Sequence, residues 1–397
     1  MSTKRLATII VMAAGIIAST GLAQQSQTNT PAKSSWADKI AIKGDLRYRY
    51  ETIEDDAKLN SQNETFTRRR DRIRARLGVE AKPSETVKIG VEIATGQNDP
   101  VSPNQTIGDV WQKKDMKLNL AYFDWSLVSN DPTTVNLVGG KQKNPFQPMG
   151  SIHDLVWDND ATPEGLVLKS QTGGETVTIG ANLGYMWLQE RSSNSDDSML
   201  YVGQGFLKFQ PMPEIGLTIG GTYYGFHDIQ GKDVLDWEKL NNAFGNSTIT
   251  GTISGSTTNK AWASEFTPIE LFASLDLFVM EFPITIFGQT LKNSDATTAF
   301  DSGFQYGVSL GKAKNPKTFE VGYTYQKLEK DAVLGALTDS DRWGGGTDGK
   351  GSKVYGKYQV AKNLQVGLTY FMNDKVISDA SKTKDYKRMQ ADLVYSF

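Results

Sequence analysis

The sequence predicts an all-β fold, a transmembrane antiparallel β-barrel of about sixteen strands with short periplasmic turns and long extracellular loops. Segments of about ten residues alternate between apolar and polar side chains from residue 40 to the end of the chain. The connections between these segments are short and long in turn. Beyond the first 23 residues no apolar run is long enough for a transmembrane helix.

The N-terminus has the features of a cleaved signal peptide. Lys4 and Arg5 precede an apolar run from Leu6 to Ala18, and small residues follow up to Ala23. The apolar run is shorter than the ~20 residues that span a bilayer, so an uncleaved anchor is disfavoured. We expect residues 1–23 to be removed during export.

The remaining chain reads as a short polar segment followed by one barrel. Residues 24–38 are polar and have no periodicity, which predicts a periplasmic N-terminal segment before a barrel over residues 39–397. Strands are expected to start near Ile40, Arg70, Val87, Lys117, Thr134, Gly165, Thr176, Met199, Gly216, Glu270, Pro283, Ser302, Thr318, Lys353, Leu364 and Tyr386.

A soluble β-sandwich or a parallel β-helix is the alternative all-β fold. Sandwich strands average about 5–6 residues, shorter than these segments. A β-helix would show a short regular repeat, and none is present. The chain also has no cysteine, so disulfides cannot stabilise an exported soluble domain. The strand length, the lack of a short repeat and the lack of cysteine all favour a closed barrel.

Four arginines at a spacing of two residues are the sharpest functional signal. Four arginines lie on one face of a strand: Arg70, Arg72, Arg74 and Arg76. Every second residue from Ile73 to Val79 points to the other face, and these residues are apolar. An arginine that faces lipid near the midplane costs about 2–4 kcal/mol, so these four must face water inside the barrel.

Basic residues on neighbouring strands extend this pattern. Closure of the barrel brings the last strands beside the first, and together they would form a basic, pore-lining wall. Acidic neighbours such as Asp45, Glu80 and Glu92 offer a purely structural alternative, in which the charges only satisfy each other. The further predicted pore-lining residues are Lys43, Arg47, Arg49, Lys353, Lys357 and Arg388.

The connection over residues 142–163 is a candidate constriction loop. Its apolar residues, such as Phe146 and Trp157, would be unusual in a loop exposed to solvent, so we expect the loop to fold into the barrel. A loop lying over the outer rim, or a subunit contact, remains an alternative. In the folded-in arrangement, three acidic residues would face the arginines: Asp154, Asp158 and Asp160.

Catalysis and cofactor binding have little support. The chain contains only His153 and His227 as histidines, and it has no metal-ligand spacing or phosphate-binding loop. His153 and Asp154 are adjacent, so on an extended chain their side chains point to opposite sides. We expect no enzyme activity and no cofactor. The net charge of −2 also disfavours a nucleic-acid partner.

Several segments resemble a putative-porin family of Gram-negative bacteria. They are Gly44–Glu51, Arg68–Glu80, Ile93–Gly96, Asn144–Phe146 and Trp157–Gly165. The resemblance implies a sixteen-stranded general porin in the outer membrane. The final alternating strand, with Tyr395 and the terminal Phe397, resembles the signal read by the outer-membrane assembly machinery. Stacked arginines also occur in phosphate-selective porins, whose motifs do not match this chain.

The expected function is passive diffusion of ions and small polar solutes, with a bias towards anions. The expected partners are outer-membrane lipid, small polar or anionic solutes and the assembly machinery, and a homotrimer is common among such porins. The alternative is a barrel that serves as an adhesin, a receptor or a structural protein through its long loops. The arginine spacing favours the pore, because an adhesin needs no basic stripe inside the barrel.

Overall fold

The computed structural model describes residues 39–148, 155–192, 196–234, 242–250 and 260–397. The predicted signal peptide, residues 1–23, and the predicted periplasmic segment, residues 24–38, lie outside these described residues. Within the described part of the chain, no helix is long and apolar enough to cross a membrane.

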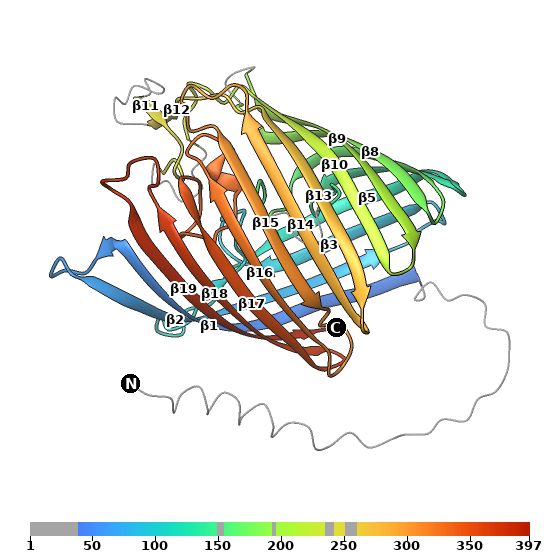
Figure 1. The fold of residues 1–397 in the computed structure, drawn as a ribbon, viewed down its shortest axis with the longest axis horizontal. Coiled ribbons are helices and arrows are strands. Elements are labelled where there is room, and N and C mark those ends of the chain that lie inside the picture. The colour runs from blue at the N-terminus through green and yellow to red at the C-terminus, as the bar shows by residue number, and fades with distance from the viewer. Residues whose placement is uncertain (1–38, 149–154, 193–195, 235–241, 251–259) are drawn as a thin grey trace. The chain divides into compact units, whose positions relative to one another are not determined.

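The described residues form a closed antiparallel barrel of 16 strands (Figure 1). Each barrel strand pairs with the next one along the chain, and β1 also pairs with β19, which closes the sheet. The barrel strands are β1 (Ile40–Leu59), β2 (Thr65–Ala81), β3 (Val87–Thr95), β5 (Met116–Asn130), β6 (Thr133–Lys141), β7 (Glu164–Gly173), β8 (Val177–Gln189), β9 (Ser198–Met212), β10 (Ile215–His227), β13 (Pro268–Val279), β14 (Phe282–Asn293), β15 (Ser302–Gly311), β16 (Phe319–Leu328), β17 (Gly349–Ala361), β18 (Leu364–Lys375) and β19 (Lys384–Ser396).

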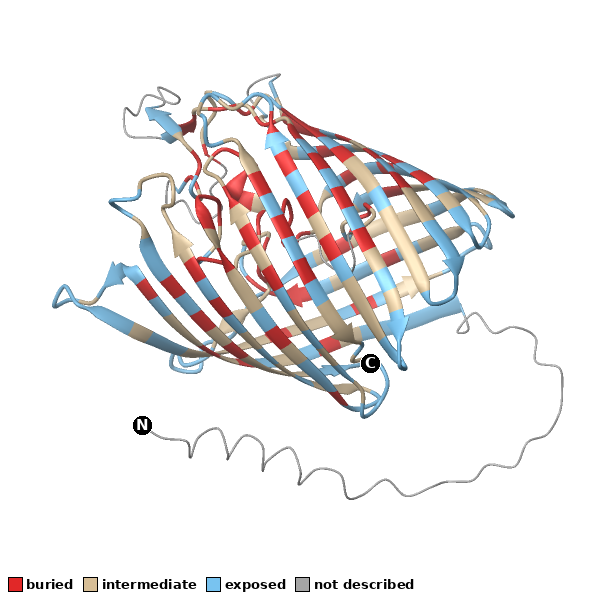
Figure 2. Cartoon of the chain, in the orientation of Figure 1, coloured by how far each residue is buried: buried red, intermediate tan, exposed pale blue. Residues whose placement is uncertain are grey.

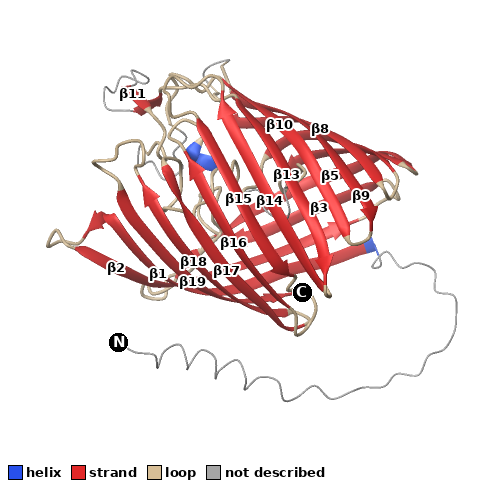
Figure 3. Ribbon diagram, in the orientation of Figure 1, coloured by secondary structure: helices blue, strands red, loops and turns tan. Residues whose placement is uncertain are grey.

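The other elements are short and belong to the connections (Figure 3). β4 (Gln105–Thr106) pairs with β2, and β11 (Thr248–Thr250) pairs with β12 (Lys260–Trp262). A 3-10 turn, η3 (Gly335–Leu337), lies between β16 and β17.

The two ends of the barrel differ in the length of their connections. The end that carries the start of β1 and the last residue has short turns, such as the one at 362–363, and we name it the turn end. The other end, the loop end, carries the connections at 96–115, 142–163, 228–267 and 329–348. This alternation is the one that the sequence predicts for a barrel in a membrane.

Predicted strand starts are close to the observed ones, with two larger differences. β2 begins at Thr65 rather than near Arg70, and β17 begins at Gly349 rather than near Lys353. Both strands extend at the loop end, where backbone pairing continues after the apolar–polar alternation has ended. The periodicity therefore detects the membrane-spanning part of a strand better than its full length.

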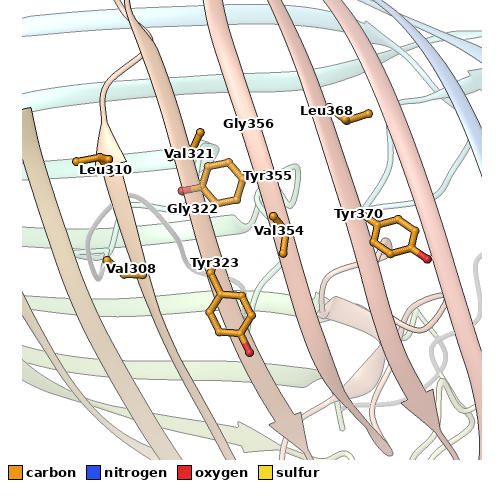
Figure 4. Close-up of a pocket in the computed structure, with 10 residues that line it drawn as sticks. All are labelled: Val308, Leu310, Val321, Gly322, Tyr323, Val354, Tyr355, Gly356, Leu368 and Tyr370. Carbon is orange, nitrogen blue, oxygen red and sulfur yellow. The ribbon is translucent and has the colours of Figure 1, made fainter. Parts of the chain in front are cut away.

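Burial alternates along each strand because the outer face carries apolar side chains and the inner face carries polar ones (Figure 2). Leu46, Leu183 and Leu368 on the outer face are more than half exposed, as lipid-facing residues must be without a membrane. Figure 4 shows an apolar depression on this face over β15–β18, where the outward Gly356 leaves space between Val321 and Leu368.

Glycines on the inner face make room for aromatic rings of a neighbouring strand. A Cβ on Gly180 would lie 2.1 Å from the Phe206 ring, and one on Gly90 would lie 2.4 Å from Tyr122. The rings therefore lie flat against the wall, a close approach that only glycine permits. This packing keeps large side chains from filling the centre of the barrel at these positions.

Candidate functional site

The arginines of β1, β2 and β19 come together on the inner face where the barrel closes. β1 lies between the other two strands, and its register places Arg47 opposite Arg74 and Arg49 opposite Arg72. Like charges directly opposite each other destabilise a sheet unless carboxylates neutralise them. We name the following residues the arginine wall: Arg47, Arg49, Arg70, Arg72, Arg74, Arg76 and Arg388.

Two carboxylates of β1 neutralise part of the wall from within. Asp45 accepts hydrogen bonds from Nε of Arg74 at 3.0 Å and from Nε of Arg76 at 2.6 Å. Glu51, which is fully buried, accepts from Arg70 and, at 3.0 Å, from Nε of Arg388. Each carboxylate thus bridges two arginines, which holds the planar guanidinium groups in fixed positions.

The described part of the 142–163 loop packs against the inner wall and reaches the arginines. The Trp157 ring contacts Tyr224 of β10 edge-on, with 5.9 Å between the ring centroids. On its other side the loop places Asp160 3.4 Å from Arg74 and 3.5 Å from Arg76. The loop therefore lies between an apolar wall and the arginine wall.

A second loop, residues 329–348, reaches the same arginines. Asp341 lies 3.2 Å from Nη1 of Arg49 and 2.9 Å from Nη2 of Arg388. Burial by itself raises the pKa of Asp341, but Arg388 and Arg49 outweigh it and hold the pKa well below its usual range. Asp341 is therefore ionised when it contacts the wall.

The 329–348 loop has its own buried core. Val333, Leu334 and Trp343 are almost fully buried, and the Trp343 indole N–H donates to the carbonyl of Gly346 at 2.9 Å. Gly346 and the two glycines before it adopt positive φ values of 88° to 96°, which favour glycine. This loop is a packed element inside the barrel rather than an open surface loop.

Asp158 joins the two loops to each other. Its backbone N–H donates to the carbonyl of Leu337 at 2.8 Å, and its Oδ2 accepts from the backbone N–H of Ser340 at 2.9 Å. Burial, then Asp339 and Asp160, raises the pKa of Asp158 well above its usual range. Asp158 thus acts as a link between loops, while Asp160 contacts the arginines.

A third segment, residues 96–104, covers the remaining arginines. The side-chain oxygen of Asn104 accepts from Nη2 of Arg47 at 2.5 Å, and the Asn104 carbonyl accepts from Nη2 of Arg72 at 2.9 Å. Neutral groups are the hydrogen-bond partners of these two arginines. Among the described residues Arg47 has no carboxylate within ion-pair distance, and Arg72 lies 3.8 Å from Glu51.

Comparison with known proteins identifies the family. The family model described as "Putative porin" matches residues 54–250 and 257–397. The chain belongs to the putative porin family. It is a protein of the outer membrane, and its family and fold are those of a porin.

Solved porin structures share the fold of this family member at low sequence identity. The high-pH structure of Pseudomonas putida OprB has a TM-score of 0.56 at 11% identity, over 91% of this chain and 95% of that chain. Salmonella typhi OmpF in complex with daunomycin has a TM-score of 0.53 at 10% identity, over 91% of this chain and 99% of that chain. None of the curated proteins matches the sequence.

The other predicted site residues of this porin lie at several places. Lys43 forms an ion pair with Glu80, and Lys357 lies 3.5 Å from Glu320. Lys353 shares the inner face of β17 with Lys357, and β17 pairs with β16 and β18. His153 and Asp154 lie outside the described residues. That these two lysines extend the basic wall of β1, β2 and β19 therefore stays a prediction from the sequence.

The packing of the 329–348 loop inside the barrel was missed in the reasoning from sequence, although a signal was present. Ala332, Val333 and Leu334 form an apolar run in a loop, and Trp343 follows, as Trp157 does in the 142–163 loop. The same criterion applied to both loops would have detected this one. The hydrogen bonds of Asn104 carry no comparable signal, because they depend on the loop conformation.

Proposed function

We propose that this porin lets ions and small polar solutes diffuse passively across the outer membrane, with a bias towards anions set by the arginine wall. The observation that carries the proposal is an imbalance of charge. Among the residues that the structure describes, the arginines of the wall outnumber the carboxylates that contact them, and the positive charge of Arg47 has only a neutral partner. The carboxylates in contact with the wall are Asp45, Glu51, Asp160, Asp341 and Asp392.

We also propose that the 142–163 and 329–348 loops form the constriction. The described part of the 142–163 loop and the 329–348 loop pack against buried apolar residues and contact the arginines, so we expect them to narrow the lumen at the depth of the charged residues. Solutes then pass close to charged groups in a confined space, where electrostatic selection is strongest. Asp160 and Asp341 reduce the positive field without cancelling it.

The test is conductance of the purified protein in a planar bilayer across a KCl gradient. We expect stable open steps and an anion-selective reversal potential. The double variant Arg47→Gln, Arg72→Gln should shift the reversal potential towards cation selectivity. The matched control Arg68→Gln, Arg69→Gln removes two exposed charges of β2 and should shift the reversal potential much less.

Two other outcomes of the bilayer experiment would contradict part or all of this proposal. A cation-selective wild type would keep the pore and contradict the role of the arginine wall. No conductance from folded protein would instead favour an adhesin, a receptor or a structural role for the long loops. Folding is checked by heat-modifiable migration in gel electrophoresis.

A further inference from the structure

A cavity of about 360 Å³ lies on the inner face of β5–β9, and residues 144–148 of the 142–163 loop form part of its lining. Its volume is within the range of about 300–1,000 Å³ that is typical of small-molecule sites. The lining is rich in amides, and the Nδ2 of Asn144 is buried without a hydrogen-bond partner. The polar groups on which the argument depends are Asn136, Asn144, Gln147, Gln171, Asn182 and Lys169.

Lys169 brings an uncompensated positive charge to this cavity. Asp124 is the carboxylate that lines it, and Asp124 already has partners: Nζ of Lys88 at 3.4 Å and Nδ2 of Asn136 at 2.8 Å. Lys169 forms no hydrogen bond or ion pair with any residue that the structure describes, although it interacts electrostatically with Asp124, Lys88 and Lys208. Most arginines of the wall, by contrast, contact a carboxylate directly.

Lys208 is not part of the cavity lining, but it places a second ammonium group over Phe206, which is part of that lining. Its Nζ lies 5.2 Å from the centroid of the Phe206 ring, and Phe206 lines the cavity. The ring lies flat over Gly180, so the wall here offers an aromatic surface next to a positive charge. Lys169 and Lys208 come from β7 and β9, on either side of the strand that carries Gly180.

A neighbouring cavity of about 290 Å³ adjoins the first one. The two cavities share Asp124, Asn144, Pro145 and Lys169, and the second is also lined by further lysines and by two carboxylates, Glu80 and Glu92. Lys169 therefore lies at the boundary between the two spaces. A solute at this position would contact polar groups of both cavities.

We propose that this cavity binds a small hydroxylated carboxylate, with Lys169 and Lys208 holding the carboxylate and the amides holding the hydroxyl groups. Charge-assisted bonds to ammonium groups provide the stronger contacts. The amide groups can donate and accept, which suits hydroxyls, while Phe206 and Pro145 contact the carbon chain. This inference rests on the proposed function, because the solute reaches the site through the pore.

The experiment is isothermal titration of the full-length, folded protein in detergent with gluconate, using sorbitol as the uncharged control. Gluconate should bind and sorbitol should bind at least about tenfold more weakly, since a bond to a charged group contributes about 1.5–3 kcal/mol. The variant Lys169→Gln, Lys208→Gln should lose this preference, and Lys169→Arg, Lys208→Arg should retain it. The matched control Lys312→Gln, Lys314→Gln removes two exposed lysines of a turn and should bind as the wild type does.

The titration separates this inference from the proposed function. No gluconate binding by folded wild type, or equal binding by the glutamine variant, would overturn the site even if the bilayer shows an anion-selective pore. Gluconate binding that depends on Lys169 would support the site even if conductance is absent. Equal affinity for sorbitol and gluconate would also overturn it, because the lysines would then contribute nothing.

Discussion

Oδ1 of Asp341 lies 2.9 Å from Nη2 of Arg388, and this ion pair ties the 329–348 loop to the last strand of the barrel. Arg388 is almost completely buried and also binds Glu51 on β1. One arginine therefore connects the closing seam of the barrel with a loop that fills part of the lumen. A buried charge of this kind is costly when one partner is removed.

The substitution Asp341→Asn tests this connection. We expect a loss of about 3 kcal/mol in the free energy of unfolding, because Arg388 and Arg49 lose a charged partner. Single-channel recordings should show larger or noisier steps as the loop loosens. The control Asp379→Asn removes an exposed carboxylate paired with Lys382 and should change neither property. Unchanged stability and conductance in Asp341→Asn would show that the loop is held by its apolar core alone.

The depressed pKa of Asp341 predicts an acid-sensitive contact. A carboxylate whose pKa is lower in the folded than in the unfolded state stabilises the fold above its unfolded pKa, about 3.9. This stabilisation is lost as the pH falls from about 3.9 through the lower folded-state pKa. Urea unfolding between pH 6 and pH 2 should therefore show a smaller acid-dependent loss of stability in Asp341→Asn than in the wild type. Parallel profiles for the two proteins would exclude this role.

The strands were predictable from the sequence because each one carries its own periodic signal. Arg70, Arg72, Arg74 and Arg76 share a face whatever the rest of the barrel does, so their position on the inner face followed from spacing and the cost of facing lipid. The closeness of Arg388 to this group followed from barrel closure alone. These conclusions need only the spacing of residues along a strand and the order of the strands in a closed barrel.

The contacts of the loops could not be predicted in the same way. Asp160 and Asp158 are two residues apart, yet one contacts Arg74 and the other contacts Ser340 of a distant loop. Such partners depend on the packing of two irregular segments, which leaves no periodic signal. The balance of charge on the arginine wall depends on these contacts, and so it became visible only in the structure.

The close approach of Gly44 to the C-terminus predicts a site that is sensitive to small substitutions. Gly44 exchanges backbone hydrogen bonds of 3.0 and 3.1 Å with Phe397, and a Cβ would lie 2.4 Å from the Arg76 carbonyl oxygen. We expect Gly44→Ala to destabilise the barrel by about 1–3 kcal/mol, measured by urea unfolding. Gly205→Ala, whose Cβ would meet nothing within 4 Å, is the matched control. Equal stability of the two variants would mean that the seam can shift at little cost.

Phe397 is predicted to act in assembly rather than in stability. Phe397 is 53% exposed and Tyr395 is 49% exposed, so about half of each side chain makes no contact within the chain, whereas the Phe397 backbone closes the seam. We expect Phe397→Ala to keep its backbone bonds and to fold in detergent with nearly wild-type stability. In cells the same variant should accumulate less in the outer membrane, measured by immunoblotting of membrane fractions. The exposed outer-face substitution Leu368→Ala controls for loss of an apolar side chain. Wild-type levels of Phe397→Ala in the membrane would contradict its role as an assembly signal, and a matching loss of stability in detergent would assign the effect to folding instead.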